Sequence, residues 1–148
     1  MFKSELPSVF YINSKKYSAS SELSYLLRNV VSHIRYEWDE LVFLCIGSDR
    51  ITGDSLGPLV GHLLSRHNWP HIHVYGTLKN PVHALNLEEI TRQIKARHPL
   101  ALIIAIDASL GSKKHIGFIT LGIGSLCPGL GVKKELPRVG DIFITGII

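Results

Sequence analysis

Two aspartates, each placed at the end of an apolar run, are the side chains in this sequence best suited to chemistry. Asp54 lies in a polar loop after the apolar run 41–46, and Asp107 directly follows the run 100–106. Runs of this kind predict strands buried on both faces of a parallel sheet, and the loops after such strands form the active-site crevice of open α/β sheets. If the two strands are neighbours, both carboxylates face one crevice.

Two carboxyl groups a few ångströms apart cannot both ionise freely, so one of them keeps its proton. The ionised group can act as general base on water, while the protonated group polarises a carbonyl. Alternatively, the pair holds a divalent cation that activates water. A purely structural alternative also stands, because aspartate often caps helices and stabilises turns. In that case Asp54 caps the next helix and Asp107 stabilises a loop.

Residues 53–56, Gly-Asp-Ser-Leu, match the signature of a class of serine esterases. That class places its serine directly after the first strand and needs a histidine base, usually in a late Asp-x-x-His. Here the seven loop residues 47–53 separate the strand from Asp54, and the sequence contains no Asp-x-x-His. The esterase is therefore the weaker alternative. A phosphate-binding P-loop is rejected, because the glycine spacing is one residue too long and an aspartate replaces the lysine.

The eight histidines raise the question of a zinc site. His71 and His73 alternate along a predicted strand and so face one side, yet the sequence has no HExxH motif and no compact Cys/His cluster. Zinc sites usually show such ligand spacing. His83 and His115, in loops near predicted strand ends, are the candidates for a third ligand beside the aspartates. The sequence thus predicts no cofactor and leaves a divalent metal open.

The spacing of apolar residues predicts the elements that must position these loops. Helical spacing with suitable end residues occurs in three segments: 20–34, with Ser20 as N-cap, 58–67, with Pro58 in first position, and 86–98, capped by Asn86. Apolar runs typical of strands occur in five: 41–46, 71–76, 100–106, 116–123 and 141–148. The polar segment 1–19 is expected to be irregular or a short strand. This alternation predicts a doubly wound, mostly parallel α/β sandwich.

Length and composition are those of one domain. The chain has 148 residues, of which 45% are hydrophobic and 19% charged, enough for one ordinary core. We take residues 1–148 as a single α/β domain. The predicted strand 141–148 would lie at an open edge with no covering helix, which is a liability for a sheet. We therefore expect either a truncated C-terminus or a partner that covers the edge.

Charge, cysteine content and hydropathy limit the classes of partner. The net charge is +4, but the basic residues are scattered, as in the lysine pairs 15–16, 113–114 and 133–134. Scattered cations disfavour direct nucleic-acid binding. Two cysteines without a CxxC motif favour a reducing, cytoplasmic compartment. No apolar run approaches the roughly 20 residues that a membrane span needs, so no membrane partner is expected.

Four motifs, taken in order, resemble the YyaC-type sporulation protein family of spore-forming bacteria. They are Asp-Arg-x-Thr-Gly-Asp-Ser-Leu-Gly-Pro at 49–58, the segment 75–87 from Tyr-Gly-Thr to Asn-Leu, Ala-Ile-Asp-Ala-Ser-Leu-Gly at 105–111, and Pro-Gly-Leu-Gly-Val-Lys-Lys-Glu-Leu at 128–136. That family is itself similar to the germination protease, which degrades small acid-soluble spore proteins, and more remotely to hydrogenase-maturation endopeptidases. The resemblance spans about residues 40–148 and implies a three-layer α/β/α sandwich of the phosphorylase/hydrolase-like type.

By position, the resemblance places Asp54 and Asp107 where the germination protease has its two essential acids. The maturation endopeptidases hold metal with acids at these points and a histidine, but no histidine here matches. The resemblance implies a peptidase-like hydrolase of the forespore or spore interior, acting on a protein or peptide such as a small acid-soluble spore protein. A non-catalytic binding or structural spore protein on the same fold is the alternative, and a homo-oligomer is left open.

Six further residues are assigned to substrate binding around this pair. Small glycines beside the aspartates would leave room for a substrate backbone, and the glycine-rich segment 122–136 could line a groove or merely connect two strands. The remaining two would shape the loop that holds Asp54. The assigned residues are Asp49, Thr52, Gly53, Gly57, Gly129 and Gly131.

Overall fold

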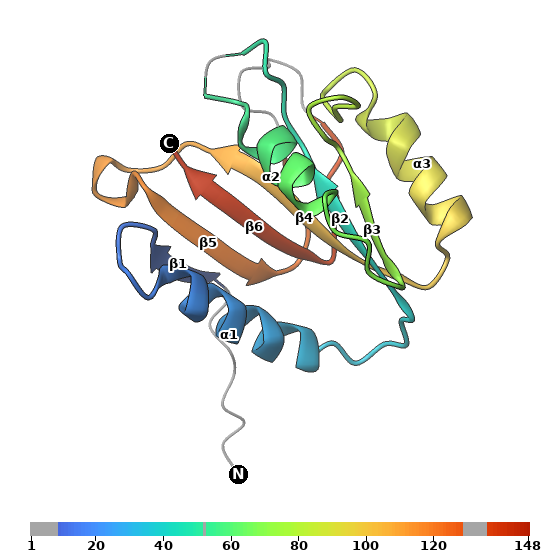
Figure 1. The fold of residues 1–148 in the computed structure, drawn as a ribbon, viewed down its shortest axis with the longest axis horizontal. Coiled ribbons are helices and arrows are strands. Elements are labelled where there is room, and N and C mark those ends of the chain that lie inside the picture. Colours follow the sequence, from blue (N-terminus) through green and yellow to red (C-terminus); the bar gives the residue numbers. More distant parts are fainter. Residues whose placement is uncertain (1–8, 52, 129–135) are drawn as a thin grey trace.

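The computed structural model describes residues 9–51, 53–128 and 136–148, and within them one sheet is flanked by helices (Figure 1). The elements are, in chain order, β1 (Val9–Asn13), α1 (Ala19–Ser32), β2 (Glu40–Cys45), α2 (Leu56–Leu64), β3 (Ile72–Tyr75), α3 (Leu87–Arg97), β4 (Ala101–Ser109), the short 3-10 helix η1 (Lys113–His115), β5 (Phe118–Ile123) and β6 (Ile142–Ile147). This α/β sandwich confirms the predicted fold class.

The strand order in the sheet is β1-β5-β6-β4-β2-β3. β2 is parallel to both β3 and β4, β4 is parallel to β6, and β5 is antiparallel to β6 and to β1. The chain therefore leaves β2 toward β3 and returns past β2 to β4, so its winding direction reverses at β2. The predicted strands 41–46 and 100–106, which correspond to β2 and β4, are neighbours in the sheet.

Two apolar clusters pack on opposite faces of the sheet, as the alternation of side chains along strands requires. On one face, Val30 of α1 and Val60 of α2 pack with Ile104 of β4. On the other face, Ile94 of α3 packs with Leu44 of β2. The sheet is thus the middle of three layers, with α1 and α2 on one side and α3 on the other.

The strand predicted at an open edge lies inside the sheet. β6 is hydrogen-bonded to β4 on one side and to β5 on the other, so the expectation of an uncovered edge was wrong. The reason is that β5 pairs outside β6, and β1 from the N-terminal segment pairs outside β5. Sequence periodicity identified the strand but carried no information on which neighbours it would have.

Helix starts differ from the prediction by up to two residues. α2 begins at Leu56, so Pro58 is its third residue, where the missing N–H loses no intrahelical bond. α1 begins at Ala19, with Ser18 rather than Ser20 at the N-cap. Asn86 occupies the N-cap position of α3 as predicted, but its side chain makes no capping hydrogen bond. Among the described residues, none of the helices combines the length and apolarity of a membrane span.

Two glycines let α2 lie directly against the strand ends. A Cβ atom at Gly57 would stand 2.0 Å from the carbonyl oxygen of Ile46, and one at Gly61 would stand 1.7 Å from that of Gly76. Any side chain at these positions would push the helix off the sheet. Because the loop after β2 leads directly into α2, this contact also holds the loop that carries Asp54.

We expect Gly61→Ala to lower the free energy of unfolding by about 1–2 kcal/mol, as overpacking does. Helix propensity alone predicts the opposite sign, an increase of nearly 1 kcal/mol in the free energy of unfolding. Urea unfolding followed by circular dichroism measures the difference, with Leu63→Ala, at an exposed position of the same helix, as a near-neutral control. A Gly61→Ala variant that is more stable than wild type would contradict the close packing.

Candidate functional site

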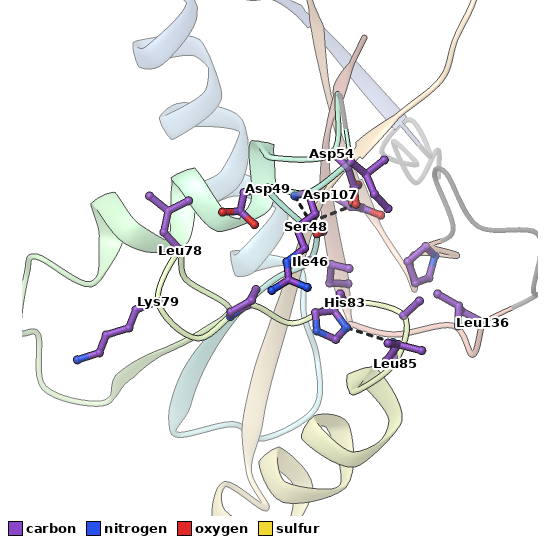
Figure 2. Close-up of a pocket in the computed structure, with 16 residues that line it drawn as sticks. Ile46, Ser48, Asp49, Asp54, Leu78, Lys79, His83, Leu85, Asp107 and Leu136 are labelled. Atoms are coloured by element: carbon purple, nitrogen blue, oxygen red, sulfur yellow. Dashed lines mark hydrogen bonds between the residues drawn. The ribbon is translucent and has the colours of Figure 1, made fainter.

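Asp54 and Asp107 line one cavity of about 610 Å³ at the carboxyl ends of β2 and β4 (Figure 2). Its walls come from the loop after β2 and from the loop between β3 and α3, with Pro128 and Leu136 completing the lining. The structure therefore brings together the two acids that the sequence places far apart. It does so at the edge of the sheet where doubly wound folds bind their ligands.

Asp107 lies within β4, not in a loop after it as predicted. β4 continues to Ser109 and pairs with β6 along its last residues, Asp107 opposite Thr145. β2 ends its pairing with β4 one step earlier, at Cys45 opposite Ile106. On the side where β2 has ended, Asp107 therefore has no neighbouring strand beside it. Asp107 lines the cavity at this point.

The loop after β2 turns back on itself and so presents the Asp54 carboxylate. The backbone N–H of Ser48 donates to the backbone oxygen of Asp54 at 2.8 Å and to its Oδ2 at 3.1 Å. Gly47 has φ +151°, and a Cβ there would stand 2.3 Å from the Asp54 carbonyl oxygen. The tight return of the chain therefore requires glycine at position 47.

Both carboxyl groups are buried, and this burial raises the pKa of each. Asp107 is 3% exposed and Asp54 7%. Burial, and then the charge of Asp54, raise the pKa of Asp107 to about 7, although its hydrogen bond from the Ala108 N–H opposes the shift. Burial also raises the pKa of Asp54, against the hydrogen bond from Ser48. Below neutral pH, Asp107 therefore holds a proton beside Asp54.

The structural alternative explains the hydrogen bonds of these aspartates but not the cavity that they share. Asp54 does not cap α2, since Ser55 is the N-cap residue and makes no side-chain capping bond. The Asp54 carboxylate instead stabilises its own loop through Ser48. Asp107 accepts a bond from the adjacent Ala108 N–H at 2.9 Å. Neither bond requires that the two acids face the same cavity, as they do.

The residues assigned to substrate binding divide into three groups. Asp49 is exposed and lines the cavity. Gly53 and Gly57 are not among its lining residues, and the space in front of Gly57 is filled by the Ile46 backbone instead of a substrate. Thr52, Gly129 and Gly131 lie outside the described residues.

One of the two candidate histidines lines the cavity. His83 does so, and its Nδ1 accepts a hydrogen bond from the Leu85 N–H at 3.2 Å, which leaves the proton of a neutral ring on Nε2. His115 lies elsewhere, stacked on Tyr11 with 4.8 Å between ring centroids. Among the described side chains, no histidine is hydrogen-bonded to Ser55, so the esterase alternative lacks its base there.

Apart from His83, the cavity-lining residues of the loop after β3 were missed by the sequence analysis. Leu78, Lys79 and Leu85 of this loop line the cavity. Between them in the sequence, Val82 forms an isolated parallel β-bridge with Ile46. The loop has no hydrophobic periodicity to mark it. A usable signal was its position, because it follows the strand next to β2 and must open at the same edge of the sheet.

Among the described residues, the side chains gathered closely enough to hold a metal ion are Glu40, His73 and His98. They lie at the amino ends of the strands, away from the aspartates. Within the described part of the chain, the Asp54–Asp107 pair therefore has no third His, Cys, Asp or Glu at ligand distance.

The comparisons with known proteins identify a family without an assigned activity. A family model described as "Protein of unknown function (DUF1256)" matches residues 11–148. The chain is 50% identical over 108 residues to "Uncharacterized protein YyaC" of Bacillus subtilis (strain 168), a match that covers 73% of this chain and 53% of that relative. The chain thus spans about half the length of the curated relative. The YyaC-type family is confirmed, and the likeness to peptidases stays a prediction.

The raised pKa of Asp107 predicts how stability depends on pH. Between about pH 4 and 7 the folded chain binds a proton at this carboxyl that the unfolded chain has released, so stability falls as pH rises through this window. Asp107→Asn removes this dependence. We expect the stability of the variant relative to wild type to rise by on the order of 1 kcal/mol per pH unit between pH 4 and 7, and to level off above.

Urea unfolding at several pH values measures this difference. Asp39→Asn, an exposed aspartate outside the cavity, serves as control and should keep the wild-type pH dependence. If Asp107→Asn and wild type differ by the same amount at pH 4 and pH 7, Asp107 titrates as an ordinary carboxyl group.

Proposed function

We propose that this chain, which belongs to the DUF1256 family, is a peptidase-like hydrolase that cleaves peptide bonds with Asp54 and Asp107. The observation that carries the proposal is the burial of both acids in one cavity, where burial and then the charge of Asp54 raise the pKa of Asp107 to about 7. A carboxyl group that keeps its proton near pH 7 beside an ionised one supplies an acid and a base at the same time.

In the proposed mechanism, Asp54 is the base and Asp107 the acid. The Asp54 carboxylate takes a proton from a water molecule, whose oxygen attacks the carbonyl carbon of the scissile peptide. The protonated Asp107 donates its proton to the carbonyl oxygen as negative charge develops there. When the tetrahedral intermediate collapses, the amide nitrogen leaves with the proton held by Asp54, and the carbonyl oxygen returns its proton to Asp107.

The cavity has the size and lining that a short peptide segment needs. Its volume of about 610 Å³ lies in the usual range of ligand sites. Ile46, Leu78 and Leu85 supply apolar lining, and the exposed cations Arg50 and Lys79 also line the cavity. We propose protein substrates of the small acid-soluble spore protein type, and a site of action in the cytoplasm of the forespore or spore, on the resemblance described above.

The proposed reaction needs no metal, because Asp54 activates the water and Asp107 polarises the carbonyl. Metal-assisted hydrolysis at the same pair predicts a different response to a chelator. Incubation with EDTA should therefore leave the cleavage rate unchanged.

Asp54→Asn and Asp107→Asn should each reduce kcat/KM for a purified small acid-soluble spore protein by at least about 10²-fold, the usual contribution of a general acid or base. Both variants should remain folded, since asparagine keeps the shape of the side chain. Mass spectrometry of the products measures cleavage, and circular dichroism measures folding. Asp39→Asn is the matched control and should retain full activity.

Two outcomes would contradict this assignment. Full activity in both single variants would remove the dyad from the reaction. Binding of the substrate by wild type with no change in its mass would favour the alternative of a non-catalytic spore protein.

The pH dependence of cleavage provides a second test. Because Asp107 must carry a proton and its pKa is about 7, log kcat/KM should decline with a slope approaching −1 above neutral pH. At lower pH the rate should fall again, as Asp54 becomes protonated. A rate that keeps rising through pH 8 is typical of a histidine base or a metal-bound hydroxide and would contradict an acid role for Asp107.

A further inference from the structure

A second group of chemically active side chains lies at the opposite, amino ends of the parallel strands. Glu40 is the first residue of β2, His73 lies in β3, and His98 directly follows α3. One potential ligand atom from each side chain lies within 4.8 Å of the other two. These residues are distant in sequence, and the proposed hydrolysis uses none of them.

We propose that Glu40, His73 and His98 bind a divalent transition-metal ion, with Zn²⁺ as the ion that fits their chemistry best. Two imidazole nitrogens and one carboxylate oxygen form a ligand set that Zn²⁺ takes in proteins, with water in the fourth position. Hard cations such as Mg²⁺ and Ca²⁺ prefer sites made of oxygen alone.

The hydrogen bonds within the group already bring the ligand atoms close to the required spacing. Nε2 of His73 and Nδ1 of His98 both contact the same atom, Oε2 of Glu40, and the His98 contact is 3.2 Å long. With Zn–ligand distances of about 2.1 Å, the ligands of a tetrahedral ion are about 3.4 Å apart. Small side-chain rotations would therefore be enough for an ion to replace the hydrogens that now lie between the two imidazole nitrogens and the Glu40 carboxylate.

Tyr75 provides the outer contact that metal-binding histidines usually have. Its hydroxyl lies 2.9 Å from Nε2 of His98. When an ion replaces the proton on Nδ1, the neutral ring carries its proton on Nε2, and the Tyr75 hydroxyl can accept a hydrogen bond from it. Such an outer hydrogen bond fixes the tautomer and the ring orientation of a ligating histidine.

The sheet holds the ligands in place while leaving an approach for the ion. His73 pairs with Val42 on β2, two residues along from Glu40, so both side chains point to the α3 face. The rings of His73 and His98 stack with 4.1 Å between centroids. The side chains are 36%, 25% and 11% exposed for His73, Glu40 and His98, so an ion and its water can reach them from solvent.

Bound metal would join β2, β3 and the end of α3 at one point. Because the unfolded chain does not hold these ligands together, an ion that binds the folded state stabilises it. With Zn²⁺ at about 100 times its dissociation constant, we expect the melting temperature to rise by about 5–10 °C.

Isothermal titration calorimetry, in which ZnCl₂ is added to the chelator-treated full chain, tests this proposal. For the wild-type chain we expect one ion per chain with a micromolar or lower dissociation constant. His73→Ala and Glu40→Gln should each bind Zn²⁺ at least 100-fold more weakly. Zn²⁺ should no longer raise the melting temperature of either variant. His62→Ala, at an exposed histidine of α2, should bind as wild type does. Asp54→Asn should also bind normally, which separates this site from the proposed hydrolytic site.

A spectroscopic measurement on the wild-type chain covers the case in which a variant fails to fold. X-ray absorption at the zinc edge should show two imidazole nitrogens and additional oxygen ligands. Less than one equivalent bound at 100 µM Zn²⁺, equal affinity in His73→Ala and His62→Ala, or an absorption spectrum without imidazole would each overturn the proposal.

Discussion

The candidate site depends on the different lengths of two paired strands. β2 and β4 are parallel neighbours whose pairing ends at Cys45 opposite Ile106, while β4 continues along β6 to Ser109. The chain after β2 has to turn away, and Gly47 allows it to do so at φ +151°. The uncovered side of β4 at Asp107 is thereby open to the loop that returns with Asp54. A shorter β4 would leave Asp107 in a loop, without the rigid support that positions a catalytic group.

Burying two carboxyl groups at this opening is costly for the folded state. Within the described part of the chain, each carboxylate accepts one backbone hydrogen bond, from Ser48 or Ala108, which is little compensation for two adjacent acids. Retention of a proton by Asp107 reduces the cost, since only one negative charge is then buried. Perturbed acids of this kind cluster at functional sites because chemistry needs them, whereas a structural role is served equally well by asparagine. The cost of burying two aspartates where asparagine would serve a structural role therefore favours a chemical role for the pair.

The elements of the fold could be predicted from the sequence because each has a local pattern. Apolar runs identified β2 and β4, and Asn86 marked the start of α3. The rule that neighbouring parallel strands share a crevice then brought Asp54 and Asp107 together. What failed was non-local: the interior position of β6 depends on β5 and β1, and the extension of β4 through Asp107 depends on β6. The Glu40–His73–His98 group required strand register and the direction of the chain after α3, neither of which the sequence encodes locally.

The two ends of the sheet thus present different chemistry, and the distance between them constrains how any metal effect is interpreted. Glu40 begins β2 and Ile46 borders the aspartate cavity, so six residue steps along an extended strand, roughly 20 Å, separate the two sites. An ion held by Glu40, His73 and His98 cannot coordinate a water that attacks a peptide beside Asp54. A chelator that lowers the melting temperature without changing the intrinsic cleavage rate is therefore consistent with both proposals together. A chelator that abolishes cleavage in a chain that remains folded points to an ion at the aspartates, and would remove the metal-free mechanism while leaving the amino-end site unaffected.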